Sequence, residues 1–112
     1  MSYKLIRDNI PALYKASEGK SLKYATVEDP TFFEELILNK LKEELAEFGE
    51  AMETRNKDKV LEELADIMTV VSSLPVLVNA TKEDLMEVYQ AKMESNGGFD
   101  KHLIGLFDEE IK

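Results

Sequence analysis

Apolar residues recur at helical spacing along the first half of the chain, and the residues between the apolar runs predict where helices begin and end. In residues 8–20, Pro11 follows two possible capping residues and a glycine comes near the end, which predicts a first short helix. Residues 29–54 carry a longer helical pattern that opens with Asp-Pro-Thr, where Asp29 is expected to cap the helix and Pro30 to be its first residue. Thr31 and Glu34 have the spacing of a capping box, so we expect them to close the start of this second helix.

Residues that are typical of helix starts and helix ends also occur in the second half of the chain. A third helix is expected from about residue 58, and Pro75 should kink or interrupt it because proline lacks the amide hydrogen that a helix needs. Thr81 and Asp84 resemble a capping box that opens a fourth helix to about residue 95. Residues 96–98, Asn-Gly-Gly, are typical of a helix stop.

The remaining segments have no helical period. Residues 3–7 and 21–28 are expected to be extended, the latter as an edge strand or a link. The tail around residues 103–107, LIGLF, is expected to be a strand or a packing arm. The predicted fold is therefore an all-α bundle of four to five helices, with short extended segments near both termini and one domain over residues 1–112.

Two nearly repeated stretches place acids inside these helical patterns. Residues 42–48 read KEELAEF and residues 61–67 read LEELADI. At 100° per residue, Glu44 lies within about 60° of Ile37 and Phe48, so it falls inside the apolar stripe of the second helix. Glu47 lies at the edge of that stripe, and Glu63 and Asp66 lie beside an apolar arc of the third helix.

Carboxylates withdrawn from water need compensation, which lysine or arginine partners, protonation or divalent cations can provide. The spacing favours cations, because Glu44/Glu47 and Glu63/Asp66 are i, i+3 neighbours on their helices. Ligation by oxygen alone selects Mg²⁺, with Mn²⁺ as the alternative. A helical di-iron site needs two Glu-x-x-His pairs, and His102 is the single histidine; zinc is disfavoured for the same reason.

Composition narrows the classes of partner. The chain has 112 residues, 44% of them apolar and 33% charged, which is typical of a globular protein. A net charge of −9 argues against binding a nucleic acid polymer, but a phosphorylated ligand can still bind through cations. The chain has no cysteine, no apolar run long enough to span a membrane and no signal-type N-terminus, so we expect a cytoplasmic protein.

The apolar arc of the third helix is wide enough to expect partners on two sides, which suggests a homodimer or homotetramer; it comprises Val60, Leu64, Met68 and Val71 together with Val70, Leu74 and Ile67.

Three motifs resemble one known family. The pattern of Glu43-Glu44-x-x-Glu47 followed by Glu63-x-x-Asp66 resembles the EExxE…ExxD signature of the all-α nucleoside triphosphate pyrophosphatases, which include MazG-type enzymes, phosphoribosyl-ATP pyrophosphohydrolases and dimeric dUTPase-like enzymes. Residues 3–11, YKLIRDNIP, resemble the KLVRDKIP opening of small stand-alone members. Residues 92–99, KMESNGGF, resemble the family's KxxxRGGF stretch.

The resemblance implies hydrolysis of a nucleotide between its α and β phosphates, with a house-cleaning role. It implies that Glu44, Glu47, Glu63 and Asp66 are metal ligands and that Glu43 orients or activates the attacking water or holds an additional metal. It further implies that Lys92 holds phosphate oxygens. Asn96 stands where an arginine is common; it can donate a hydrogen bond to a phosphate but carries no charge.

Two alternatives remain open at this point. One is the phosphoribosyl-ATP step of histidine biosynthesis, and the other is a non-catalytic helical module whose acids bind a metal or a partner. Arg7, in the matching N-terminal stretch, can contact phosphate or another subunit, but we expect it to form a surface ion pair with an acid such as Asp8.

Overall fold

The computed structural model describes residues 3–108 and is built from α1 (Ile10–Glu18), α2 (Pro30–Thr54), α3 (Lys57–Ser72), the short 3₁₀ helix η1 (Pro75–Val78) and α4 (Lys82–Asn96). These residues contain no β-strand, which confirms the all-α prediction. Residues 20–29 form an irregular link rather than an edge strand. The tail over residues 103–107 is neither strand nor packed arm within the described chain, because its apolar side chains are exposed.

Capping explains where the two long helices begin. Asp29 caps α2 by accepting a hydrogen bond from the Thr31 amide at 3.0 Å, and Pro30 is the first helical residue, which confirms the predicted start of this helix. The additional capping box of Thr31 and Glu34 does not form. An Asp directly before a proline at the first helical position is the stronger start signal. Asn56 caps α3 by accepting from the amide of Lys59 at 3.2 Å.

The fourth helix and the break before it follow the prediction. The helix α3 ends at Ser72, and Pro75 begins η1, as expected of a residue without an amide hydrogen. Thr81 and Asp84 form a reciprocal capping box for α4, with hydrogen bonds of 3.1 and 2.9 Å. Gly97 ends α4 with a backbone φ of 75°, a conformation that residues other than glycine seldom adopt.

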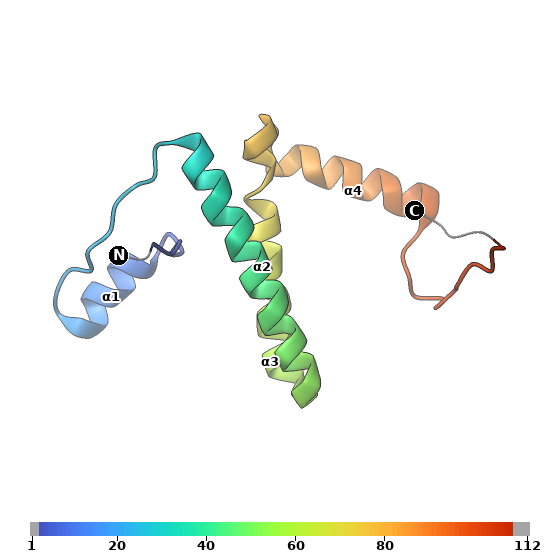
Figure 1. The fold of residues 1–112 in the computed structure, drawn as a ribbon, viewed down its shortest axis with the longest axis horizontal. Helices are drawn as coiled ribbons and strands as arrows, with labels where there is room; N and C mark the ends of the chain where they lie inside the picture. Colours follow the sequence, from blue (N-terminus) through green and yellow to red (C-terminus); the bar gives the residue numbers. More distant parts are fainter. Residues whose placement is uncertain (1–2, 109–112) are drawn as a thin grey trace.

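The helices α2 and α3 form an antiparallel hairpin, while α1 and α4 extend away from it on opposite sides (Figure 1). The apolar residues that are buried within residues 3–108 all come from α2 and α3, and they are Ile37, Ala51 and Val70. The radius of gyration is 18.3 Å, compared with about 13 Å for a compact chain of this length. The hairpin is therefore the packed part of the molecule, and the other helices pack little against it.

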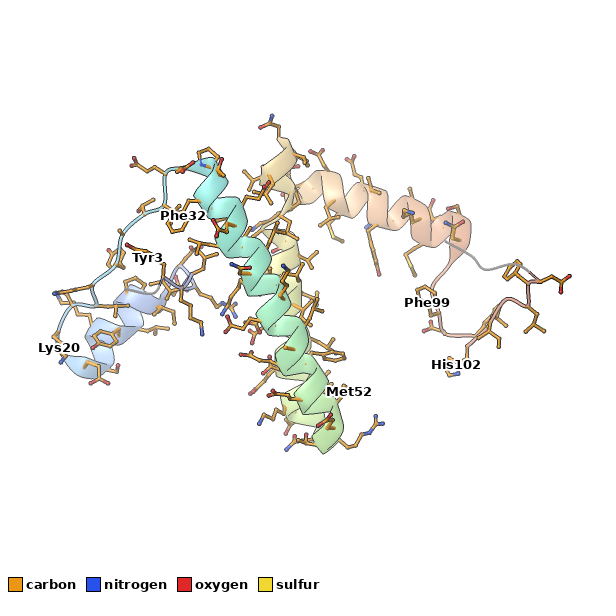
Figure 2. All side chains as sticks on the ribbon, viewed as in Figure 1. Tyr3, Lys20, Phe32, Met52, Phe99 and His102 are labelled. Atoms are coloured by element: carbon orange, nitrogen blue, oxygen red, sulfur yellow. The ribbon has the colours of Figure 1, made fainter. Side chains whose placement is uncertain are left out.

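Large apolar side chains remain exposed on every element outside the hairpin seam. Figure 2 shows Phe99 projecting from the loop after α4, and it is 93% exposed. The others include Leu61, Met68, Val88, Tyr89, Leu103, Ile104 and Leu106. No single described helix is both long and apolar enough to cross a membrane. One pair of segments has the required length and apolar character when taken together, but it is bent by 109°; it consists of Lys57–Val78 and Lys82–Asn96.

Candidate active site

The acids of the two repeated stretches meet across the hairpin. Glu44 of α2 and Glu63 and Asp66 of α3 each present a carboxylate oxygen, and these oxygens lie within 4.8 Å of one another. The meeting follows from the fold, because each acid lies inside or beside an apolar stripe and the stripes of α2 and α3 face each other. We call Glu44, Glu63 and Asp66 the acid cluster.

The acid cluster contains buried oxygens that lack partners. Glu44 is 4% exposed, and its Oε2 meets no hydrogen-bond donor among residues 3–108. The Oε2 of Glu63 is also buried without a partner in the same part of the chain. An unsatisfied buried polar atom costs about 1–3 kcal/mol, and more when it is charged. Hard divalent cations bind carboxylate oxygens, so the donor set fits Mg²⁺ or Mn²⁺.

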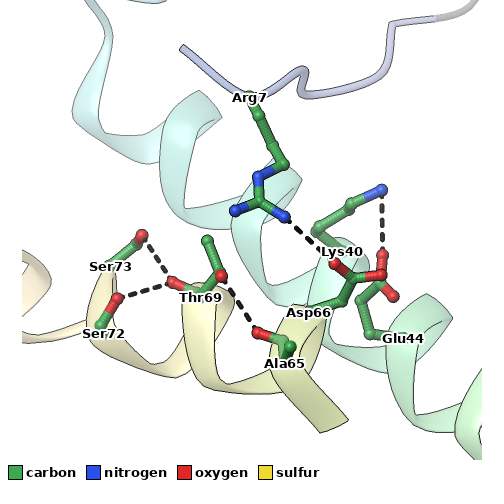
Figure 3. A network of polar contacts seen from close by, with 8 residues as sticks. All are labelled: Arg7, Lys40, Glu44, Ala65, Asp66, Thr69, Ser72 and Ser73. Carbon is green, nitrogen blue, oxygen red and sulfur yellow. Dashed lines mark hydrogen bonds and ion pairs between the residues drawn. The ribbon is translucent and has the colours of Figure 1, made fainter. Parts of the chain in front are cut away.

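Lys40 supplies part of the compensation from within α2. Its Nζ lies 3.2 Å from Oε1 of Glu44 and 3.6 Å from Oε1 of Glu43, and its side chain is 22% exposed (Figure 3). Lys40 was absent from the candidates proposed above. Its spacing was a usable signal, because a lysine four residues before Glu44 lies on the same helical face.

Two further cations reach the acids from the N-terminal segment. The Nζ of Lys4 lies 2.9 Å from Oε1 of Glu43. The Nη1 of Arg7 donates a hydrogen bond to Oδ1 of Asp66 at 3.1 Å (Figure 3). Arg7 therefore forms an ion pair, as expected, but with a member of the acid cluster rather than with Asp8. Arg7 and Asp66 are 59 positions apart in the sequence, so no local pattern could predict this pairing.

The pKa values of Glu43 and Glu47, the two acids that flank the acid cluster on α2, are shifted in opposite directions. The pKa of Glu47 is raised, first by burial and then by the negative charge of Glu44 one turn away. The pKa of Glu43 is lowered, chiefly because its carboxylate accepts a hydrogen bond from Lys4. Cationic partners therefore compensate part of the negative charge of the acids, and the two unpartnered oxygens of Glu44 and Glu63 remain for a metal ion.

The structure does not bring the other candidates to the acid cluster. Lys92 and Asn96 are exposed on α4, which extends away from the hairpin (Figure 1). His102 is likewise exposed, in the loop after α4 (Figure 2). A hollow of 360 Å³ lies at the other end of α3, between Phe33 and Pro75, and no residue of the acid cluster lines it.

Comparison with known proteins identifies one family. The family model of the MazG nucleotide pyrophosphohydrolase domain matches residues 32–102, which include all but the first two residues of α2, the whole of α3 and α4, and the candidate residues on these helices, but not Arg7. There is no match among curated proteins and none among solved structures. Proteins of this family typically use a divalent metal, which the acid cluster is suited to bind. The chain belongs to the MazG nucleotide pyrophosphohydrolase family and is a hydrolase that acts on nucleotide pyrophosphate bonds.

Proposed function

We propose that this protein hydrolyses a nucleoside triphosphate between the α and β phosphates, with Mg²⁺ as cofactor and Mn²⁺ as a substitute, and that it removes unwanted nucleotides in the cytoplasm. The observation that carries this proposal is the acid cluster, in which two buried carboxylate oxygens lack a partner within the described chain. A helical hairpin gains nothing in stability from such oxygens, so their retention points to a ligand.

Four carboxylates would hold the metal, namely those of Glu44, Glu47, Glu63 and Asp66. Two divalent ions bound there would polarise the α phosphate, activate a water molecule and neutralise the leaving group. Glu47 is half-buried beside Glu44, and its pKa is raised by burial and then by the negative charge of Glu44, so a cation bound there would favour the charged form that ligates a metal.

The chain's own residues then position the reactants. Glu43 is held in its charged form by Lys4, so it can accept a hydrogen bond from the attacking water. A bound divalent ion would lower the pKa of that water, so that a weakly basic carboxylate could take its proton. Lys92 would bind phosphate oxygens as a point charge, and Asn96 would donate a hydrogen bond without adding charge.

A second copy of the chain is part of the proposal. Lys92 and Asn96 lie on a helix that extends away from the acids of its own chain, and apolar side chains are exposed along α3 and α4. A homodimer, or a tetramer made of two dimers, would cover those side chains and bring α4 of one copy to the acid cluster of the other. The site is then shared between subunits.

The first experiment is a screen for pyrophosphate release from natural and modified nucleoside triphosphates and from phosphoribosyl-ATP, with Mg²⁺ or Mn²⁺. We expect activity on at least one nucleotide and its loss in Glu47→Gln and Asp66→Asn. Glu35→Gln serves as the matched control, because Glu35 is exposed on α2 and lies about 180° from Glu44. If the wild-type protein releases no pyrophosphate from any of them, the chain is a non-catalytic module.

A second experiment tests the shared site. Lys92→Gln and Glu47→Gln are purified separately, and each is expected to be nearly inactive. When they are mixed and allowed to exchange subunits, half of the dimers combine the two variants, and one of the two sites in each carries both wild-type residues. Activity should therefore recover to about a quarter of the wild-type value, a limit set by the symmetry of the dimer. No recovery despite verified exchange would place Lys92 and the acids of one site in the same subunit.

A further inference from the structure

The N-terminal segment before α1 contacts the hairpin at three points, two of which are acids. The ring of Tyr3 packs edge-on against Phe32 of α2, with ring centroids 5.7 Å apart (Figure 2). Lys4 reaches Glu43, and Arg7 reaches Asp66 on the other helix of the hairpin. A segment without regular structure thus delivers two cations to the acids, one on each side of the seam.

Stability alone is a weak reason for this placement. Fixing each residue of an irregular segment costs about 1–2 kcal/mol of backbone entropy. An exposed ion pair returns about 0–1 kcal/mol, and the side chains of Lys4 and Arg7 are 66% and 64% exposed. The placement is better explained by something that the two cations bind.

The guanidinium of Arg7 has donors to spare. A guanidinium offers five N–H groups in one plane, and within residues 3–108 only Nη1 of Arg7 meets a protein acceptor. Its neighbour Lys40 differs, because that ammonium group is largely covered and already lies between Glu43 and Glu44. Arg7 and Lys4 are therefore the exposed cations at the acids that can still accept an anionic partner.

We propose that Arg7, assisted by Lys4, binds the β and γ phosphates of the substrate and stays with them as the leaving pyrophosphate. This inference rests on the proposed function. When Asp66 serves as a metal ligand, its charge is neutralised, and the attraction that holds Arg7 to Asp66 weakens. The planar donor set of Arg7 matches two phosphate oxygens at once.

The charge balance of the reaction favours the pyrophosphate end over the α phosphate. The water oxygen forms a bond to the α phosphorus, the water proton passes to Glu43, and the bond from the α phosphorus to the bridging oxygen breaks. The electron pair of that bond leaves with the pyrophosphate, so negative charge grows on the leaving group. A cation placed there stabilises the transition state more than the ground state.

The test measures binding of inorganic pyrophosphate by calorimetry in saturating Mg²⁺, which needs neither a known base nor turnover. Arg7→Gln is expected to weaken this binding by about 10- to 100-fold, the range for losing hydrogen bonds to a charged group. Arg7→Lys should lose less, because it keeps the charge but not the fork. Lys20→Gln is the matched control, since Lys20 is exposed just after the end of α1 and forms no ion pair within the described residues.

Manganese affinity, measured by calorimetry on the same variants, separates binding of phosphate from an indirect effect on the acids. We expect Arg7→Gln to bind Mn²⁺ at least as well as the wild type, because it removes a cation that competes for Asp66. A parallel loss of Mn²⁺ and pyrophosphate binding would show that Arg7 only organises the acid cluster, and it would overturn the inference. If Arg7→Gln does not fold, Arg7→Lys decides: pyrophosphate binding equal to wild type overturns the inference, and a loss with Mn²⁺ binding intact supports it.

The two proposals fail differently. If the wild type hydrolyses a nucleotide and binds pyrophosphate, but Arg7→Gln binds pyrophosphate equally well, then Arg7 has no phosphate role and the proposed function stands. If the wild type binds no Mn²⁺ and releases no pyrophosphate, the proposed function fails and this inference fails with it.

Discussion

Replacing Glu44 by glutamine should make the protein more stable and at the same time unable to use a metal. Glu44 is the buried acid of the hairpin, and its carboxylate lies within 4.8 Å of those of Glu63 and Asp66. At an effective dielectric constant of about 20, each such pair repels by about 3.5 kcal/mol, so two pairs amount to about 7 kcal/mol. Lys40, at 3.2 Å, returns about 5 kcal/mol of attraction.

The difference predicts that Glu44→Gln raises the free energy of unfolding by about 2 kcal/mol in EDTA. For a domain of this size, that corresponds to a rise in Tm of about 5–10 °C. Adding Mn²⁺ should reverse the order, because a ligand at 100 times its Kd stabilises the wild type by about 2.7 kcal/mol and the variant much less. Calorimetric melting at one fixed protein concentration, with EDTA or Mn²⁺, measures both effects.

Glu35→Gln is again the control, and it should melt within about 0.5 kcal/mol of the wild type in both buffers, as exposed substitutions usually do. The reasoning is refuted if Glu44→Gln is less stable than the wild type in EDTA, since the repulsion at the acid cluster would then not exceed the attraction of Lys40. It is also refuted if Mn²⁺ stabilises Glu44→Gln as much as the wild type.

Three further predictions concern other positions. Because the pKa of Glu47 is raised on folding, the stability that its protonated form contributes is lost as pH rises from the ordinary value of 4.5 through the folded pKa. In urea unfolding with EDTA, the free energy of unfolding of Glu47→Gln should therefore increase relative to the wild type across that pH range. A difference that stays constant with pH would contradict the shift. Ala51 is 1% exposed between α2 and α3, so Ala51→Leu should lose about 1–3 kcal/mol in denaturant unfolding while the exposed Ala46→Leu stays near wild type; equal stabilities would argue against close packing there. Asn96→Arg should lower the KM for the nucleotide several-fold by adding a phosphate-binding charge, which Gln90→Arg on the same helix should not do.

The helices and the pairing of the acids could be predicted because both depend on local signals. Capping residues, Pro75 and Gly97 set the ends of helices within a few positions of where they act. The position of Glu44 inside an apolar stripe follows from the helical period, and a short turn at residues 55–56 makes α2 and α3 antiparallel neighbours.

The contacts of the N-terminal segment could not be predicted in the same way. Arg7 and Asp66 are 59 positions apart, and no periodicity links an irregular segment to a helix. A local partner, Asp8, was the natural expectation for Arg7, and the fold supplied a distant one. The start of α2 at Asp29 and Pro30 was predicted correctly, but the additional capping box of Thr31 and Glu34 does not form, because Asp29 already caps this helix.

The few buried positions between α2 and α3 must provide both the apolar packing of the hairpin and an acid of the candidate site. Three apolar residues are buried there, and Glu44 is buried among them, so a charged group takes up space that an apolar side chain would use to stabilise the hairpin. Such a hairpin is held by little hydrophobic area, and the apolar surface of α3 and α4 that it leaves exposed is the surface that a second copy would cover. In the proposed dimer, metal binding and subunit association would act on the same hairpin, because cations would remove the repulsion between the acids and a second copy would bury the outer faces of α3 and α4. Loss of either should loosen the hairpin, so removal of the metal should also weaken the association of subunits.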